Sequence, residues 1–93
     1  MHYVPLGSSG LKVSQLCLGA MNFGGRSTDA AAAKIVGMAR DAGVNFIDTA
    51  ESYAGGKSEE VLSKLIKRDR DSWVLATKLG SKAIKDGPNQ RGL

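Results

Sequence analysis

The sequence has little cysteine, few aromatic residues and no long apolar stretch. Its single cysteine, Cys17, cannot form a disulfide within the chain, and its place in an apolar run predicts a small buried core residue rather than a nucleophile. Two Phe, two Tyr and one Trp, with no basic residues interleaved among them, form no base-stacking platform, so nucleic acid is not an expected partner. No apolar run approaches the roughly 20 residues that cross a bilayer, so we expect no membrane insertion.

The start of the chain and its charge add further expectations. Met1 to Pro5 carries neither the charged nor the apolar region of a signal peptide, so we expect a cytoplasmic protein. Thirteen basic and nine acidic residues give a formal charge of +4. This charge is compatible with a polyanionic partner such as a phosphorylated cofactor, but by itself it does not identify one. A length of 93 residues allows at most one small domain.

Three short apolar runs have the form of buried parallel strands. They are Leu16 to Leu18, Val44 to Ile47 and Trp73 to Ala76. If Leu18, Ile47 and Ala76 are equivalent positions, both intervals are 29 residues, which is the period of a repeated strand-helix unit. Parallel strands joined by helical crossovers have their carboxyl ends at one edge of the sheet.

Two amphipathic segments between these runs predict the crossover helices. A residue from Ser27 to Asp29 can cap the first helix, and Gly43 can end it. Gly37 inside this helix suggests a close approach to a neighbouring element. Ser58 is expected to cap the second helix. The buried stripe of that helix is Val61, Leu62, Leu65 and Ile66.

The two ends of the chain complete the predicted fold. Tyr3 to Leu6 and Leu11 to Ser14 flank a glycine-serine turn, which predicts an N-terminal β-hairpin, and Gly87 to Leu93 has the composition of a loop. Eight of the repeats would give about 232 residues, close to the roughly 250 of an eight-stranded α/β barrel. The predicted class is therefore α/β, with residues 1–93 forming the N-terminal portion of a single (β/α)8 TIM barrel domain: a β-hairpin, three parallel strands and two helices.

An acid, a phenol and an amine follow two of the predicted strands. Asp48 and Tyr53 come after the second run, and Lys78 comes after the third. Taken singly, they are typical of a turn former, a loop aromatic and an exposed strand end. Their joint occurrence at the carboxyl edge, where α/β barrels carry their active sites, predicts a catalytic site.

Residues Gly43 to Glu59 closely resemble the signature segment of the aldo-keto reductases. Leu16 to Gly19, Ala76 to Lys78 and Gly87 to Leu93 also resemble that family in order and spacing, so the resemblance covers essentially the whole chain. The pattern is similar to the branch that contains bacterial aldo-keto reductases and the β subunits of voltage-gated potassium channels, whose corresponding segments also carry Ala-Glu-x-Tyr and Gly-Lys.

The resemblance implies a barrel that binds NADPH and transfers its hydride to the carbonyl carbon of an aldehyde or ketone. Tyr53 matches the acid that protonates the carbonyl oxygen, Lys78 the ammonium that favours loss of the phenol proton, and Asp48 the carboxylate that pairs with the lysine. The cofactor-binding residues that the resemblance implies are Ala20, Met21, Arg26 and Asp48.

The sequence leaves three interpretations of the chain open. The family's catalytic histidine falls beyond Leu93, and His2, the one histidine here, lies in the predicted hairpin, so the chain alone is expected to be inactive. It can belong to a carbonyl reductase with a small-molecule substrate, to a regulatory module that binds a nicotinamide cofactor like the channel β subunits, or to a barrel fragment. A fragment would cover its open sheet edge with a second copy or with the missing barrel portion.

Overall fold

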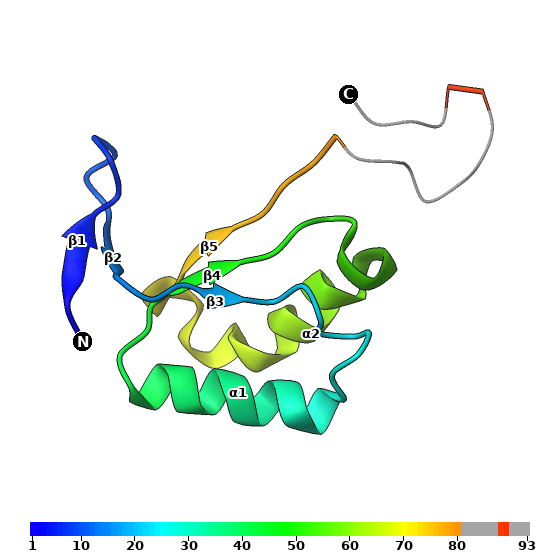
Figure 1. Cartoon of the computed structure of the whole chain (residues 1–93), viewed down its shortest axis with the longest axis horizontal. Coiled ribbons are helices and arrows are strands. Elements are labelled where there is room, and N and C mark those ends of the chain that lie inside the picture. Colours follow the sequence, from blue (N-terminus) through cyan, green and yellow to red (C-terminus); the bar gives the residue numbers. More distant parts are fainter. Residues whose placement is uncertain (81–87, 90–93) are drawn as a thin grey trace.

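The computed structural model describes residues 1–80 and 88–89, so the loop expected from Gly87 to Leu93 lies almost entirely outside the described residues. The chain runs from a small hairpin into alternating strands and helices (Figure 1). In order, the elements are β1 (Tyr3–Pro5), β2 (Lys12–Ser14), β3 (Leu18–Gly19), α1 (Asp29–Asp41), β4 (Phe46–Asp48), the 3-10 helix η1 (Tyr53–Gly56), α2 (Lys57–Leu65), the 3-10 helix η2 (Lys67–Ser72) and β5 (Val74–Ala76).

The strands form two separate sheets. β1 and β2 pair antiparallel, and β3, β4 and β5 form a parallel sheet in that order, which confirms the predicted hairpin and three parallel strands. Leu18 lies opposite Ile47, and Ile47 lies opposite Leu75, so the second interval is 28 residues. The prediction that Ala76 is equivalent to Ile47 was wrong by one residue, and Ala76 pairs with Asp48 instead.

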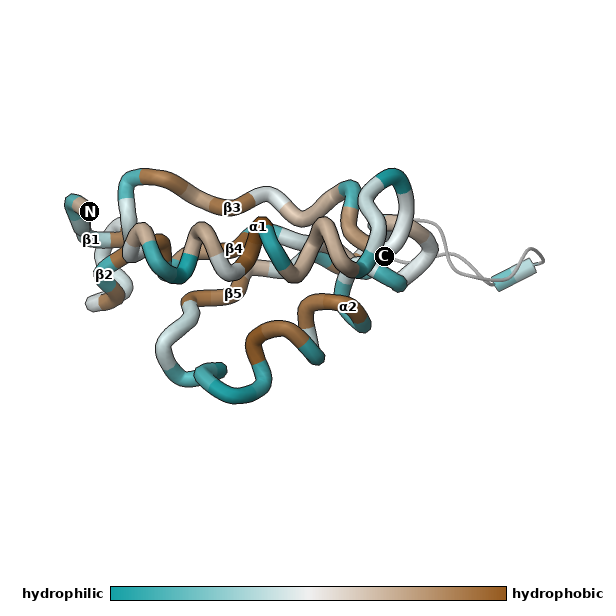
Figure 2. The backbone as a smooth tube through the Cα atoms, turned by 90° about the horizontal axis from the view of Figure 1, so that it is seen from below, coloured by the Kyte–Doolittle hydropathy of each residue, from teal (hydrophilic) through white to brown (hydrophobic). Residues whose placement is uncertain are grey.

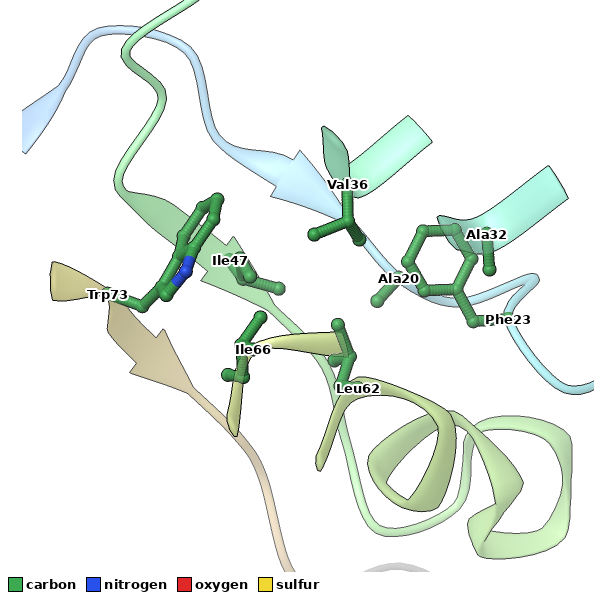
Figure 3. Close-up of a cluster of buried hydrophobic side chains, with 8 residues drawn as sticks. All are labelled: Ala20, Phe23, Ala32, Val36, Ile47, Leu62, Ile66 and Trp73. Atoms are coloured by element: carbon green, nitrogen blue, oxygen red, sulfur yellow. The ribbon is translucent and has the colours of Figure 1, made fainter. Parts of the chain in front are cut away.

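Both α-helices pack on the same face of the parallel sheet. Their contact with the strands forms one buried apolar cluster, in which Ile47 of the central strand is fully buried. Its members are Ala20, Phe23, Ala32, Val36, Ile47, Leu62, Ile66 and Trp73 (Figure 3). Figure 2 shows the matching apolar stretches along the three strands and α2. Burial of these side chains removes apolar surface from water and is the main driving force for this arrangement.

Cys17 lies outside this core. Side chains alternate along a strand, and Leu18 packs against the core, so Cys17 faces the opposite side of the sheet and is exposed. The predicted burial was wrong because, among the described residues, helices cover only one face of the sheet. Partial desolvation and the nearby Asp48 carboxylate raise the pKa of the Cys17 thiol, which makes it a poor nucleophile.

The two helices begin in different ways. Thr28, one of the three predicted candidates, caps α1, since its hydroxyl accepts the Ala31 N–H at 3.1 Å. α2 begins instead after Gly56, whose φ of +96° is left-handed, and no side chain caps it. The prediction that Ser58 is the cap was wrong: Ser58 lies inside the helix and is fully buried.

The hairpin docks at the amino-terminal end of the parallel sheet, on the turn between α1 and β4. The Tyr3 hydroxyl donates to the Gly43 carbonyl at 2.6 Å. The Asn45 side chain accepts the Ser14 N–H at 2.7 Å and donates to the Lys12 carbonyl at 3.1 Å. These bonds hold the hairpin at the end of the sheet opposite to the carboxyl edge.

One half-buried arginine joins α1 to the end of α2 and to η2. The Arg40 guanidinium on α1 donates to the Asp69 carboxylate at 2.7 Å and to the Leu65 carbonyl at 2.9 Å, and lies 5.8 Å from the centre of the Trp73 ring. It holds the pKa of the Asp69 carboxyl below its ordinary value. The contacts of Arg40 therefore tie α1 to the segment that leads from α2 into β5.

Two glycines provide a test of this packing. Gly24 has a φ of +78°, and a Cβ there would lie 2.6 Å from the Lys57 Cβ, whereas a Cβ at Gly37 would meet nothing within 4 Å. The close approach predicted at Gly37 was therefore wrong. We expect Gly24→Ala to lower the free energy of unfolding by about 2 kcal/mol or more, because it combines backbone strain with overpacking. Gly37→Ala should raise it by about 0.5–1 kcal/mol. Urea denaturation measures both, and equal stabilities would contradict this packing of the loop on α2.

Candidate active site

Lys78 and Asp48 form an ion pair at the carboxyl edge of the parallel sheet. The Lys78 Nζ donates to Asp48 Oδ1 at 2.8 Å and Oδ2 at 2.9 Å, and to the Thr49 carbonyl at 2.7 Å. An ammonium has three N–H donors, and these three acceptors use all of them. The position of the Lys78 charge is therefore fixed by two residues at the end of β4.

The observed strand register brings this pair together. Asp48 lies opposite Ala76, and Lys78 follows two residues later, so its side chain emerges on the same face as that of Asp48. A shift of one residue would move the lysine to the face that carries the helices. The 28-residue interval therefore matters for the site as well as for the sheet.

Tyr53 contacts the same charge from the loop after β4. The Lys78 Nζ lies 5.0 Å from the centre of the Tyr53 ring, within the range of a cation–π interaction. The chain reverses direction directly after the tyrosine, because Ala54, Gly55 and Gly56 all have positive φ values, of 53°, 65° and 96°. The half-buried phenol ring lies beside the Lys78 ammonium, which belongs to the segment that follows β5. The three predicted catalytic residues are thus neighbours in space.

Two glutamates hold the segment that carries Lys78. The Glu51 backbone N–H donates to the Lys78 carbonyl at 3.0 Å, and its carboxylate accepts the Gly80 N–H at 3.0 Å. The Glu59 carboxylate accepts the Thr77 hydroxyl at 3.0 Å. The sequence did not predict a role at this site for either glutamate, although Glu51 and Glu59 lie within the segment that carries the family resemblance.

The ion pair raises the pKa of Lys78. The first cause is the hydrogen bond to the Asp48 carboxylate, which favours the charged ammonium. The side chains of Lys78 and Asp48 are 50% and 43% exposed, so water and salt screen their attraction. The charged lysine is therefore the stable form over the whole neutral range of pH.

A cavity of about 420 Å³ opens beside these groups. Its lining residues are Ala50, Ser52, Tyr53, Lys78, Leu79 and Gly80. Their position at the carboxyl edge gives a small molecule access to the phenol and to the ammonium. An acid and a cation that line one cavity, with a carboxylate bonded to the cation, can move a proton and stabilise a developing negative charge.

The predicted cofactor-binding residues differ in what they expose. Met21, directly after β3, is 60% exposed, and Arg26 is also exposed. Ala20 is fully buried, its N–H donates to the Asp48 carbonyl at 2.9 Å, and its carbonyl accepts the Phe23 N–H at 3.1 Å. Ala20 therefore has no exposed side chain for a ligand, whereas Met21 exposes an apolar side chain and Arg26 and Asp48 expose charged ones.

In residues 1–80 and 88–89, no group of three or more His, Cys, Asp or Glu side chains is arranged to hold a metal ion. No helix in that part of the chain is long and apolar enough to span a membrane.

Comparisons of sequence and of structure both give oxidoreductases as the relatives of this chain. Residues 15–93 match the sequence model of the Aldo/keto reductase family. The uncharacterised oxidoreductase YrpG of Bacillus subtilis is 42% identical over the whole chain, which covers 32% of that protein. A Pseudomonas aeruginosa protein described as an aldo-keto reductase is 46% identical, with a TM-score of 0.76 over 84% of this chain and 31% of that one. The holo form of aldo-keto reductase AKR11C1 from Bacillus halodurans is 31% identical, with a TM-score of 0.82 over 100% of this chain and 30% of that one.

The chain spans about a third of the length of these relatives. Its fold corresponds to the N-terminal part of their barrel, as the sequence predicted. The three relatives are bacterial, so the resemblance to channel β subunits stays a prediction.

The Asp48–Lys78 pair predicts a specific titration. Asp48→Asn should lower the pKa of Lys78 toward its ordinary value of 10.5, because the charged acceptor is lost. In the unsubstituted protein, the pair contributes its full stabilisation of the fold at pH values below the ordinary lysine pKa. This contribution is lost as the pH rises through the raised pKa of Lys78 in the folded state. Proton–carbon NMR of the Lys78 Cε measures the titration. Asp71→Asn is the control, and an unchanged Lys78 pKa in Asp48→Asn would contradict the pair.

Proposed function

The chain belongs to the aldo/keto reductase family, and we propose that it supplies the catalytic acid and its supporting charges to an NADPH-dependent reductase of aldehydes or ketones. The observation that carries this proposal is the Lys78 ammonium, which is bonded to Asp48, faces the Tyr53 ring and borders an open cavity. The complete enzyme needs the rest of the barrel, because the chain spans about a third of its relatives.

Reduction of a carbonyl group requires an acid at the oxygen. Negative charge develops there as the carbon accepts a hydride, and Tyr53 would donate the proton that neutralises it. A nearby ammonium favours loss of a phenol proton, and Lys78 would have this role. Asp48 would keep the ammonium in place through its two short hydrogen bonds, at 2.8 and 2.9 Å.

Three of the residues that the family resemblance assigns to the cofactor expose groups that suit a nicotinamide cofactor. Bound NADPH would supply the hydride. The half-exposed Asp48 carboxylate can accept a ribose hydroxyl, Met21 offers an apolar surface, and the exposed Arg26 offers a cation for a phosphate. Ala20 would contribute through the backbone bonds that it makes, since its side chain is buried.

The remaining barrel is the expected macromolecular partner, and the cytoplasm the expected location. A cavity of about 300 Å³ between α2 and β5 is lined partly by the apolar side chains of Leu62, Ile66 and Leu75. Neighbouring strand-helix units of a barrel cover such surfaces, and an uncovered edge strand otherwise pairs with another chain. The third of the barrel formed here would therefore join the other two thirds or, without them, self-associate.

Tyr53→Phe tests the proposed acid directly. The test protein is a complete barrel in which residues 1–93 replace the matching third of the Bacillus subtilis relative. We expect carbonyl reduction to fall by about 10²–10⁴-fold, the usual contribution of general acid catalysis, while the dissociation constant for NADPH stays nearly unchanged. Tyr3→Phe, which removes a hydroxyl at the opposite end of the sheet, should leave turnover intact. Unreduced turnover in Tyr53→Phe would remove the tyrosine from the mechanism.

Lys78→Met tests the role of the ammonium. In the same barrel it should lower kcat and shift the pH profile of kcat, because the charge that favours loss of the phenol proton is gone. Lys64→Met, on the last turn of α2, is the matched loss of one positive charge and should change neither. An unshifted pH profile in Lys78→Met would mean that this ammonium does not act on the phenol.

A further inference from the structure

A chain of buried hydroxyl groups joins α2 to the ends of two strands. Ser58, the second residue of α2, is fully buried, and its Oγ donates to the Ala20 carbonyl at 2.7 Å. The same Oγ lies 2.8 Å from Oγ1 of Thr49, which is 1% exposed. Three segments that are distant in the sequence therefore meet at one serine.

The direction of these bonds follows from counting hydrogens. A serine hydroxyl has one hydrogen, and a backbone carbonyl can only accept. Because Ser58 gives its hydrogen to the Ala20 carbonyl, the Thr49 hydroxyl must be the donor in the other contact. The chain of bonds thus runs from Thr49 through Ser58 to Ala20. Without Ser58, the buried Thr49 hydroxyl would lose its acceptor.

Both ends of this chain are bonded to the candidate active site. The Thr49 backbone carbonyl accepts the Lys78 Nζ at 2.7 Å. The Ala20 N–H donates to the Asp48 carbonyl at 2.9 Å. Thr49 and Ala20 therefore adjoin the two partners of the ion pair, and a shift of either backbone changes the separation of Asp48 and Lys78.

We propose that Ser58 is a positioning residue for the carbonyl reduction, which acts through Thr49 and Ala20 to hold Lys78 and Asp48 in their reactive arrangement. This role rests on the proposed function. The Ser58 hydroxyl bonds to Thr49 and Ala20 rather than to the charged groups themselves. On the helix Ser58 neighbours the apolar core residue Leu62, so an alanine would satisfy the packing alone. The Ser58 hydroxyl is needed because it accepts the hydrogen bond from Thr49 and donates one to the Ala20 carbonyl, and these two bonds link the segments.

A double-mutant cycle in the grafted barrel tests this role. Its variants are Ser58→Ala, Thr49→Val and the pair together. The control is Ser63→Ala, because the Ser63 hydroxyl bonds within α2, to the Glu60 carbonyl. Turnover is measured at saturating substrate and divided by the concentration of NADPH-binding sites, which removes losses due to unfolding. Ser58→Ala should lower kcat by about tenfold to a hundredfold, the scale of a small misplacement of reacting groups, and change KM much less.

Three results would support the role together. Ser58→Ala should cost less in the Thr49→Val background than alone, because the orphaned donor is then absent. Ser63→Ala should behave as the unsubstituted barrel. In the cofactor-free barrel, the Lys78 ammonium signal in nitrogen NMR should exchange with water faster in Ser58→Ala than in Ser63→Ala, which tests positioning without turnover.

Other results would overturn it. A kcat within about twofold of the unsubstituted barrel, with only the melting temperature lowered, would make Ser58 a packing residue. Additive effects in the cycle would show that it does not act through Thr49. If Ser58→Ala does not fold, the nearly isosteric Thr49→Val removes the same link and must lower kcat. A folded barrel that binds NADPH and reduces no carbonyl would overturn the proposed function and this role with it.

Discussion

The three hydrogen bonds of the Lys78 ammonium are the interaction on which the candidate site depends. Two go to the Asp48 carboxylate and one to the Thr49 carbonyl. They join β4 to the segment after β5 and present a fixed positive charge to the Tyr53 ring. This charge is partly exposed, so its geometry comes from the strand register and from backbone contacts more than from burial.

The rest of the chain keeps those strand ends in place. The hairpin closes the amino-terminal end of the sheet, and Arg40 ties α1 to the segment that enters β5. On the carboxyl side, Glu51 fixes the chain just beyond Lys78, while the buried hydroxyl of Ser58 joins α2 to β3 and β4. The apolar core sets the layers, and these polar contacts set the positions of individual groups within them.

The sequence predicted those features that depend on local chemistry or on the long segment that resembles the family signature. The Thr28 cap, the hairpin, the strand order and the proximity of Asp48 to Lys78 belong to this class. The register of β5 was off by one residue, because an apolar run of four residues can pair in either of two ways until its neighbours are present. The 28-residue interval appears only when the strands are paired.

Other features depend on contacts between distant segments. A serine near the start of a helix is typical of a cap, and only the packed structure shows that Ser58 turns inward to Thr49 and Ala20. The apolar run around Cys17 predicts a core residue, and this prediction holds only for a strand that is covered on both faces. The exposure of Cys17 follows from the open face of a sheet whose described helices all lie on the other side.

A single-turnover measurement tests the account most directly. The complete barrel that carries residues 1–93 is loaded with one equivalent of NADPH and mixed with an excess of a simple aromatic aldehyde such as 4-nitrobenzaldehyde. The account predicts that each bound NADPH is oxidised and yields one molecule of alcohol. NADPH that stays bound and unoxidised at every pH tested would contradict it and would favour a regulatory module that only senses the cofactor.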